Sequence, residues 1–251
     1  MKQLIGVVAA AICFCAPAIA ADMPMPVKAT PAPVVAINNW TGCYVGAGGG
    51  YGMWNQAHTF ESPPGVAQSI ETTTGGRGWF GTGQFGCDYQ VGNWVVGAFA
   101  DGDFGDLAGT MSTVNDRAGR EHQKWSWAAG GRLGYVVLPK LLAYASGGFT
   151  QAHFDRFELV NLTDGSPAGF HIDAYNYKGW FIGSGYEYAL PWIPGIFWKT
   201  EYRYSKYNTA GLRWVLDGVS INVPFVPLPD QLTRSHTSEQ TIRSELVWRF
   251  N

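Results

Sequence analysis

The stretch FWKTEYRYSKY, residues 197–207, alternates two kinds of side chain along its length. Its odd positions from Lys199 to Arg203 are charged, whereas its even positions from Trp198 to Tyr204 are aromatic residues and one threonine. Successive side chains of a β-strand point to opposite faces, so the stretch predicts a strand with one charged and one aromatic face. A Lys or Arg on the lipid face of a membrane barrel costs about 2–4 kcal/mol at the midplane. The charged face is therefore expected inside a barrel and the aromatic face against lipid.

Seven further segments show the same period of two, with glycines and aromatic residues throughout, and each has the roughly ten residues that a membrane-crossing strand needs. The eight predicted strands are 40–54, 79–90, 94–104, 125–136, 141–154, 178–189, 197–207 and 240–250. Short connections lie at 91–92, 137–140 and 190–196. Long connections lie at 55–78, 105–124, 155–177 and 208–239. This alternation predicts an all-β fold, an eight-stranded antiparallel up-and-down transmembrane β-barrel with short periplasmic turns and long extracellular loops.

The composition favours a membrane protein over a soluble one. Charged residues make up 14% of the chain, against 46% hydrophobic residues, 15% aromatic residues and 33 glycines. A soluble domain usually has about 25% charged residues, and a lipid-facing wall explains the deficit. The net charge is −2, and no basic stripe is present. We therefore expect no nucleic-acid partner.

The start of the chain predicts export. Lys2 precedes an apolar run at 4–16, and Ala18-Ile19-Ala20 is a cleavage site of the small-x-small type. Residues 1–20 are therefore a predicted signal peptide, because the apolar run is shorter than the roughly 20 residues of a membrane-anchoring helix. Residues 21–37 are rich in proline and are a predicted periplasmic tether. The barrel then occupies 38–251, and the expected location is the bacterial outer membrane.

Strand parity assigns five acidic and five basic side chains to the barrel interior. They are Asp101, Asp103, Arg132, Glu187, Lys199, Glu201, Arg203, Arg243, Glu245 and Arg249. A balanced set suits a closed interior, because an unpaired buried charge is costly, and eight strands enclose just enough room for side chains. We predict a salt-bridge network that fills the barrel. The alternative is a gated polar path for small solutes.

Outward-facing aromatic residues near strand ends are expected to form girdles at the two membrane interfaces. The predicted periplasmic girdle contains Trp40, Trp94, Tyr135, Trp192 and Trp248. The predicted outer girdle contains Trp54, Trp79 and Trp125.

Only Cys43 and Cys87 remain after cleavage of the signal peptide. If Tyr51 lies opposite Trp79, the same register places Cys43 opposite Cys87, on the lipid-facing side near the periplasmic end. Two interpretations stay open. Exported proteins meet an oxidising compartment, which favours a cross-strand disulfide, but two small apolar thiols packed against lipid fit the positions as well.

The sequence shows no motif of a metal, cofactor or nucleotide site. The run GAGGGYG at 46–52 resembles a phosphate loop, but it lies inside a predicted strand with no helix after it. For a lipid-modifying enzyme, the candidate pair is Ser146 and His153. These two residues are seven positions apart on one strand and so point to opposite faces. We therefore predict no catalytic residue and no cofactor.

Several stretches together resemble a known group. NNWTGCYVGAGGGYG at 38–52 is similar to the opening strand of small outer-membrane β-barrel (porin-family) surface antigens of alphaproteobacteria. The later strands of that group are matched in order by GNWVVGAFADGDF at 92–104, GGRLGYVV at 130–137, LLAYASGGFTQA at 141–152, GWFIGSGYEYAL at 179–190 and WKTEYRYSKYN at 198–208. The chain departs from the group at Cys43, where an aromatic residue is commoner, and at Asn251, which follows the usual terminal aromatic. The resemblance implies an eight-stranded barrel whose loops are recognised by hosts or partners, and it implies no catalytic residue.

The functional expectation is an integral outer-membrane barrel with a structural role in the envelope and surface-exposed interaction loops. The expected partners are outer-membrane lipid and lipopolysaccharide, together with host or envelope partners that contact the loops, and the expected state is a monomer. A narrow porin-like channel for small polar solutes is the alternative, and an outer-membrane lipid-modifying enzyme is the third class.

Overall fold

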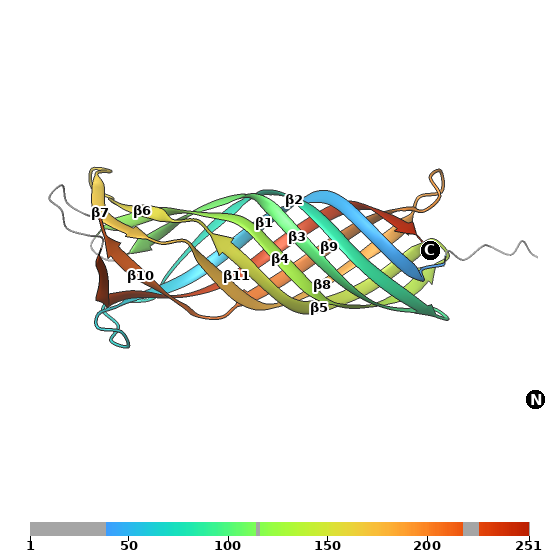
Figure 1. Cartoon of the computed structure of the whole chain (residues 1–251), viewed down its shortest axis with the longest axis horizontal. Helices are drawn as coiled ribbons and strands as arrows, with labels where there is room; N and C mark the ends of the chain where they lie inside the picture. The colour runs from blue at the N-terminus through green and yellow to red at the C-terminus, as the bar shows by residue number, and fades with distance from the viewer. Residues whose placement is uncertain (1–38, 114–115, 218–225, 251) are drawn as a thin grey trace, which may run out of the picture. The chain divides into compact units, whose positions relative to one another are not determined.

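The computed structural model describes residues 39–113, 116–217 and 226–250, so the predicted signal peptide and the whole of the predicted tether lie outside the described residues. The strands are β1 (Gly42–Glu61), β2 (Thr72–Val91), β3 (Trp94–Thr113), β4 (Arg117–Leu138), β5 (Leu141–Phe154), β6 (Phe157–Asn161), β7 (Pro167–Ile172), β8 (Tyr175–Ala189), β9 (Ile196–Tyr207), β10 (Ala210–Leu216) and β11 (Val226–Phe250). Figure 1 shows them wound around one axis. No helix of the described part is long and apolar enough to cross a membrane.

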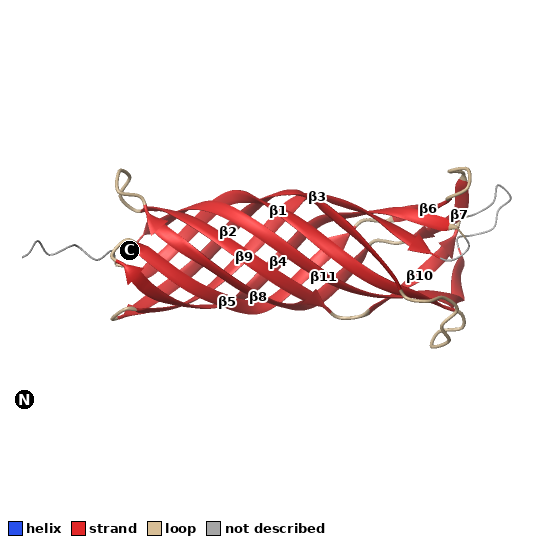
Figure 2. Ribbon diagram, turned by 180° about the vertical axis from the view of Figure 1, so that it is seen from behind, coloured by secondary structure: helices blue, strands red, loops and turns tan. Residues whose placement is uncertain are grey.

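The strands close into an antiparallel ring. Its order is β1-β2-β3-β4-β5-β8-β9-β11, and β11 pairs back onto β1 from Cys43 opposite Phe250 to Glu61 opposite Leu232. At one end the connections are the short turns at 92–93, 139–140 and 190–195. The predicted eight-stranded up-and-down barrel is therefore confirmed. Figure 2 shows that nearly all of the described chain is strand.

The predicted long outer loops are largely strand, which corrects the sequence-based bounds. β1, β2 and β3 each have 20 residues, about twice what one membrane crossing needs. The register also continues across a break, because Phe154 lies opposite Tyr175 on one side and Phe157 opposite Ile172 on the other. β6, β7 and β10 thus extend β5, β8 and β9 upward and continue the wall between β4 and β11.

The upper part of the barrel has a hydrophobic core of its own. We use this name for β6, β7 and β10 together with the ends of β1, β3, β4 and β11 that lie beyond the membrane. The buried members of the core are Met111, Phe157, Leu159, Ile172, Leu212 and Trp214. The sequence signal was weak here because the outside of these strands faces water instead of lipid. Polar residues then occupy the outward face as well as part of the inward face, and the contrast between the two faces fades.

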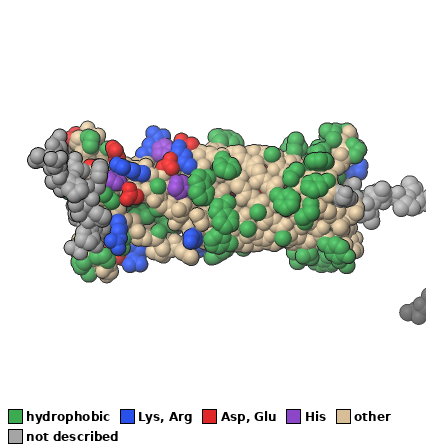
Figure 3. Space-filling view, in the orientation of Figure 1, with side chains coloured by type: hydrophobic (Ala, Val, Ile, Leu, Met, Phe, Trp, Pro, Cys, Tyr) green, Lys and Arg blue, Asp and Glu red, His purple; other side chains and the backbone are tan. Residues whose placement is uncertain are grey.

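Two bands of exposed hydrophobic side chains mark the membrane interfaces (Figure 3), and their aromatic members form the two girdles. The inner girdle, beside the short turns, includes Tyr89, Trp94, Tyr135, Trp198 and Trp248. The outer girdle includes Trp79, Phe104, Trp127 and Trp180. Exposed aliphatic residues such as Val96, Leu133, Ile182, Ile242 and Leu246 lie between them. The predictions for Trp94, Tyr135, Trp192, Trp248 and Trp79 agree with their exposure.

Trp40 and Trp54 were predicted in the girdles, and both predictions are wrong. Their side chains are buried inside the barrel, at 0% and 1% exposure. Trp54 shares its parity on β1 with the inward-facing Gly50 and Gly52, so the strand pattern itself requires an inward ring. Trp40 precedes β1 and packs on Phe197 in the barrel mouth, with its ring centroid 4.9 Å from that of Phe197.

Candidate functional site

All ten charged side chains predicted inside the barrel are buried there. None is more than 7% exposed. They come from β3, β4, β8, β9 and β11, and where a strand contributes more than one, the residues are an even number of positions apart, which places them on one face. They form a buried charge network inside the membrane-spanning part of the barrel.

The lower part of the network lies near the short turns and joins two arginines to two acids. Arg132 donates to Asp88 through Nε at 2.9 Å and also contacts Glu187. Arg249 Nη2 lies 2.7 Å from carboxylate oxygens of both Asp88 and Glu187. Arg249 Nη1 also donates to the carbonyl oxygen of Trp40 at 2.9 Å. The mouth of the barrel is therefore closed by ion pairs and one indole ring.

The middle part joins Asp101 and Asp103 to two arginines. Arg203 donates to Asp101 through Nη1 at 2.9 Å and Nη2 at 2.7 Å. Arg243 donates to Asp103 through Nη2 at 3.0 Å and reaches Asp101 through Nη1 at 3.2 Å. Arg203 Nη2 also lies 2.8 Å from Glu201. Paired forks of this kind are the strongest hydrogen-bonded geometry of arginine with carboxylates.

Lys199 links the remaining acids of the network. Its Nζ lies 3.6 Å from Glu201 and 3.7 Å from Glu245, and it donates to Gln84 Oε1 at 2.7 Å. Gln84 in turn contacts Glu245. Lys199 thus completes a second connected set of seven residues, Asp101, Asp103, Lys199, Glu201, Arg203, Arg243 and Glu245. Tyr144 bridges this set to the lower one, because its hydroxyl donates to Glu201 at 2.9 Å and its ring centroid lies 5.1 Å from the guanidinium of Arg132.

Asp88 is the network residue that the sequence analysis missed. It is 5% exposed and faces the interior from β2. With it, six acids face five bases, so the predicted equality of the two charges is wrong. The parity of Thr82 and Gln84 on the same strand, both buried, was the signal that could have found it.

Aromatic rings fill the space between the ion pairs. The guanidinium of Arg203 lies 4.3 Å from the ring centroid of Phe181, and that of Arg132 lies 4.6 Å from that of Tyr44. Gly50 makes room for this filling, because a Cβ atom there would lie 2.4 Å from the Phe80 ring. The glycine-rich run at 46–52 therefore serves packing inside the barrel.

Beyond the outer girdle the interior holds two further buried acids that the sequence placed in loops. Glu121 accepts from Tyr175 at 2.5 Å and from Gln56 at 3.3 Å, and its Oε2 has no hydrogen-bond partner among the described residues. Glu239 accepts from Gln123 at 3.1 Å and Tyr207 at 2.7 Å. The register shift around Lys124 moves the odd positions of β4 inward above it. Parity taken from 125–136 therefore could not have found Glu121.

Glu121 lies outside the membrane-spanning part, because its neighbours on β4, His122 and Lys124, form ion pairs with Asp106 on the outer wall. Figure 3 shows charged and histidine side chains on the wall beyond the outer hydrophobic band. Burial raises the pKa of Glu121 to about 7, and hydrogen bonds from Tyr175 and Gln56 offset only part of that rise. No ion pair joins Glu121 to a base within the described residues. The upper interior is thus able to gain or lose one proton near neutral pH.

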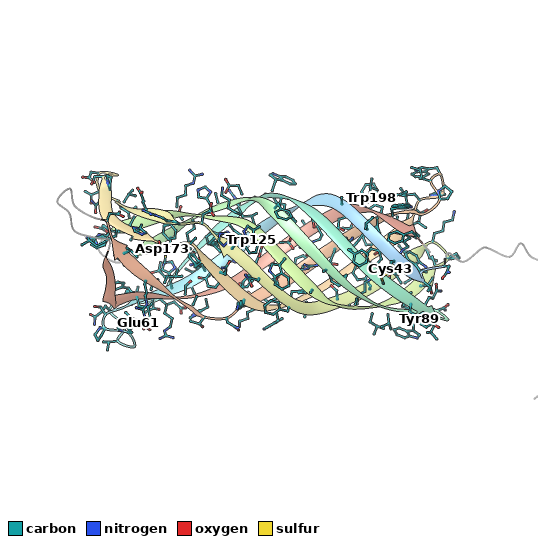
Figure 4. All side chains as sticks on the ribbon, in the orientation of Figure 1. Cys43, Glu61, Tyr89, Trp125, Asp173 and Trp198 are labelled. Atoms are coloured by element: carbon teal, nitrogen blue, oxygen red, sulfur yellow. A yellow bond between two sulfur atoms is a disulfide. The ribbon has the colours of Figure 1, made fainter. Side chains whose placement is uncertain are left out.

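The cysteines lie in the register that the sequence predicted. Cys43 is opposite Cys87, Tyr51 is opposite Trp79, and a disulfide joins Cys43 to Cys87. Figure 4 shows Cys43 near the end of the barrel that also carries Tyr89 and Trp198. The disulfide interpretation is therefore the one that the structure adopts.

The structure separates the two residues considered for catalysis. Ser146 is buried in the interior at 8% exposure. His153 stacks on the outward-facing Trp125, with centroids 4.9 Å apart, and its Nδ1 lies 2.8 Å from Asn176 Oδ1. The barrel wall lies between Ser146 and His153. Among the described residues no group of three His, Cys, Asp or Glu side chains could hold a metal ion.

Comparison with known proteins gives the family. No family model matches the chain. The 31 kDa outer-membrane immunogenic protein of Brucella melitensis biotype 1 is 31% identical to it over 263 aligned positions, which cover 100% of both chains. This chain belongs to the family of the outer-membrane immunogenic proteins. The 25 kDa outer-membrane immunogenic protein of Brucella canis is 30% identical over 83% of this chain and 85% of its own.

Members of the outer-membrane immunogenic protein family are named for the outer membrane, which is where this chain is located. Among solved structures, OprG from Pseudomonas aeruginosa aligns with 85% of this chain and 98% of its own, at a TM-score of 0.48 and 12% identity. Ail from Yersinia pestis aligns with 83% of this chain and 99% of its own, at a TM-score of 0.38 and 9% identity.

Proposed function

We propose that the protein is a closed, non-conducting barrel with a structural role in the outer membrane, and that it presents its upper part to partners outside the cell. The observation that carries this proposal is the two sets of ion pairs, bridged by Tyr144, that fill the membrane-spanning interior. It acts as a monomer and catalyses no reaction.

The closure is supported at three levels. Arg249 and Trp40 fill the barrel at the short turns, and Arg203 with Asp101 fills its middle. Above them lies a packed layer that includes Trp54, Phe80, Leu107, Phe154, Tyr177 and Tyr207. A small barrel of eight strands has room for such a filling and little beyond it.

Planar-bilayer recording tests the closed barrel against the porin-like channel. The wild-type protein should give no stable discrete openings. A double variant, Asp101→Ala with Arg203→Ala, removes one ion pair from the middle of the network and shows whether the assay detects an opened interior. Discrete wild-type openings of constant size would replace our proposal with a narrow channel for small polar solutes.

The upper part is the region that partners are able to reach. The relatives are named as immunogenic, and the upper core around Met111 and Trp214 supports a rigid recognition surface in place of flexible loops.

Thiol labelling on intact cells tests whether the upper part is exposed outside the cell. A membrane-impermeant thiol reagent should label an Asp173→Cys variant, because this exposed position follows β7. The same reagent should not label the control variant Lys140→Cys, which lies at the short turns. Equal protection of both positions would contradict it.

The absence of catalysis is proposed from the separation of Ser146 and His153 by the barrel wall. Incubation with labelled phospholipid and lipopolysaccharide tests it directly. Unmodified lipid after prolonged incubation is the expected result, and time-dependent product formation that requires folded protein would overturn it.

A further inference from the structure

A ring of basic side chains surrounds the barrel just beyond the outer girdle. Arg77 precedes Trp79 by two positions on β2, and Lys178 precedes Trp180 by two positions on β8. Both strands run toward the short turns, so the two basic residues lie above the two tryptophans. Lys206 on β9 is the direct partner of Trp180, and Lys124 lies beside the girdle on β4. We call these four residues, Arg77, Lys124, Lys178 and Lys206, the basic collar. It is at the level where the charged head groups of the outer leaflet meet the protein.

Three of the four collar residues have no acidic partner among the described residues. Lys124 lies 3.1 Å from Asp106, but no ion pair joins Arg77, Lys178 or Lys206 to a carboxylate within that part of the chain, and all three are exposed. Two further acids lie near the collar, and each contacts a histidine: Glu71 lies 3.2 Å from His236, and Asp155 lies 3.5 Å from His153. Positive charge is therefore left free on this surface.

Within residues 39–250 as far as the structure describes them, the opposite rim of the membrane shows no such collar. The short turns at 92–93, 139–140 and 190–195 contain a single basic residue, Lys140. If the basic residues served solubility alone, we would expect them at both rims of the barrel. Basic side chains at one rim alone match an anionic surface on that side of the membrane, because an anionic leaflet attracts each nearby Lys or Arg by about 1 kcal/mol.

Two adjoining hollows on the outer wall lie within the collar. One, of about 260 Å³, is lined by Asn55, Thr73, Tyr204, Lys206, His236 and Ser238, among others. The second, of about 450 Å³, is lined by Met53, Asn55, Gly75, Arg77, Ala108 and Thr110, among others. Asn55 lines both, so the two form one depression with a basic residue on each side.

The depression has the chemistry of a sugar-phosphate site. Arg77 offers a planar fork that suits a phosphate, and Lys206 offers a point charge. Asn55, Thr73 and Ser238 offer hydrogen-bonding groups suited to sugar hydroxyls. Met53, exposed at 47%, continues the depression toward the lipid-facing band, where acyl chains lie.

We propose that this depression binds the phosphorylated glycolipid of the outer leaflet, with Arg77 and Lys206 as its phosphate contacts. Lys178 and Lys124 extend the same attraction around the barrel to neighbouring head groups. The site rests on the outer-membrane location and does not depend on whether the barrel conducts.

Binding of bisphosphorylated lipid A in mixed detergent micelles tests the site. The double variant Arg77→Gln with Lys206→Gln should weaken binding about tenfold or more, because each basic residue near an anionic surface contributes a comparable attraction. The matched control, Lys140→Gln with Arg213→Gln, removes the same charge away from the depression and should bind as the wild type does. Gel mobility before and after boiling shows that each variant is folded.

Measurements on the wild-type protein alone make the test independent of the variants. Lipid A freed of its phosphates should bind about tenfold more weakly, and salt should reduce the affinity for the phosphorylated form. Equal binding of both lipids, or equal weakening in the two double variants, would overturn the proposal. Full competition by inorganic phosphate at the same concentration as lipid A would also overturn it, because the site would then recognise a free anion.

Discussion

Arg203 on β9 and Asp101 on β3 face each other across the inside of the barrel and form a bidentate ion pair, although 102 residues separate them in the chain. The two strands are not neighbours in the sheet. The pair therefore joins distant parts of the wall through the interior, which hydrogen bonds between adjacent strands cannot do.

Breaking this pair should be strongly destabilising. Asp101→Asn leaves Arg203 buried beside fewer compensating charges, and the loss of one partner of a buried pair costs about 3–5 kcal/mol. The free energy of unfolding in urea, measured in lipid bilayers, gives the cost. Lys178→Gln on the outer surface is the control and should change stability by less than about 0.5 kcal/mol.

The double variant Asp101→Asn with Arg203→Gln separates pairing from burial. If the two side chains act as a pair, the double variant should lose less stability than the sum of its single variants. Additive losses would mean that each side chain is stabilised by other neighbours, such as Arg243 and Glu201.

The inward charges could be predicted from the sequence because lipid forbids the opposite assignment. On β9, Lys199 and Arg203 leave only one orientation for the strand, and the residues opposite them follow from parity. The same constraint ends at the outer girdle. Above the outer girdle the wall faces water, which accepts charged and polar side chains. The sequence around Glu121 and in β6, β7 and β10 therefore shows no clear alternation of polar and apolar residues. At Lys124 a register shift also exchanges the inward and outward positions of β4, above the level at which lipid restricts the choice of side chains.

Reduction of the Cys43–Cys87 disulfide should raise the intact mass of outer-membrane protein by two hydrogens. The crosslink closes a loop between positions 44 residues apart, so its loss should cost about 2–4 kcal/mol. The variant Cys43→Ala with Cys87→Ala should still change gel mobility on boiling, because the β1–β2 ladder continues far beyond the crosslink. Two free thiols in freshly extracted wild-type protein would contradict the bond.

Glu121 should make stability fall as pH rises between about 4.5 and about 7. Its pKa is near 4.5 in the unfolded chain and is raised to about 7 by burial in the folded barrel. The folded state therefore binds the proton more tightly, and the stability that protonation contributes is complete below pH 4.5 and is lost as pH passes through 7. The loss amounts to about 3 kcal/mol at most.

Glu121→Gln should remove this pH dependence, since an amide keeps the shape of the protonated carboxyl group and does not titrate. Urea unfolding of the two proteins at pH 5 and pH 8 measures the difference, with the exposed Glu158→Gln as a control that should follow the wild type. Parallel pH profiles for wild type and Glu121→Gln would show that Glu121 is already ionised in the folded barrel at pH 5.

Trp214 should hold the upper part of the barrel together without affecting the membrane ring. Its side chain is 1% exposed, packs against Phe60 and Phe170, and donates from Nε1 to Thr233 Oγ1 at 3.0 Å. Trp214→Ala should cost about 3–5 kcal/mol locally. Because β10 joins β7 and β11, this loss should open the upper wall to proteases while the protein still shows the gel mobility shift of a closed barrel. Trp192→Ala, at a short turn and 72% exposed, is the matched control and should stay protected. If Trp214→Ala also abolished the mobility shift, the upper part and the membrane ring would be a single cooperative unit.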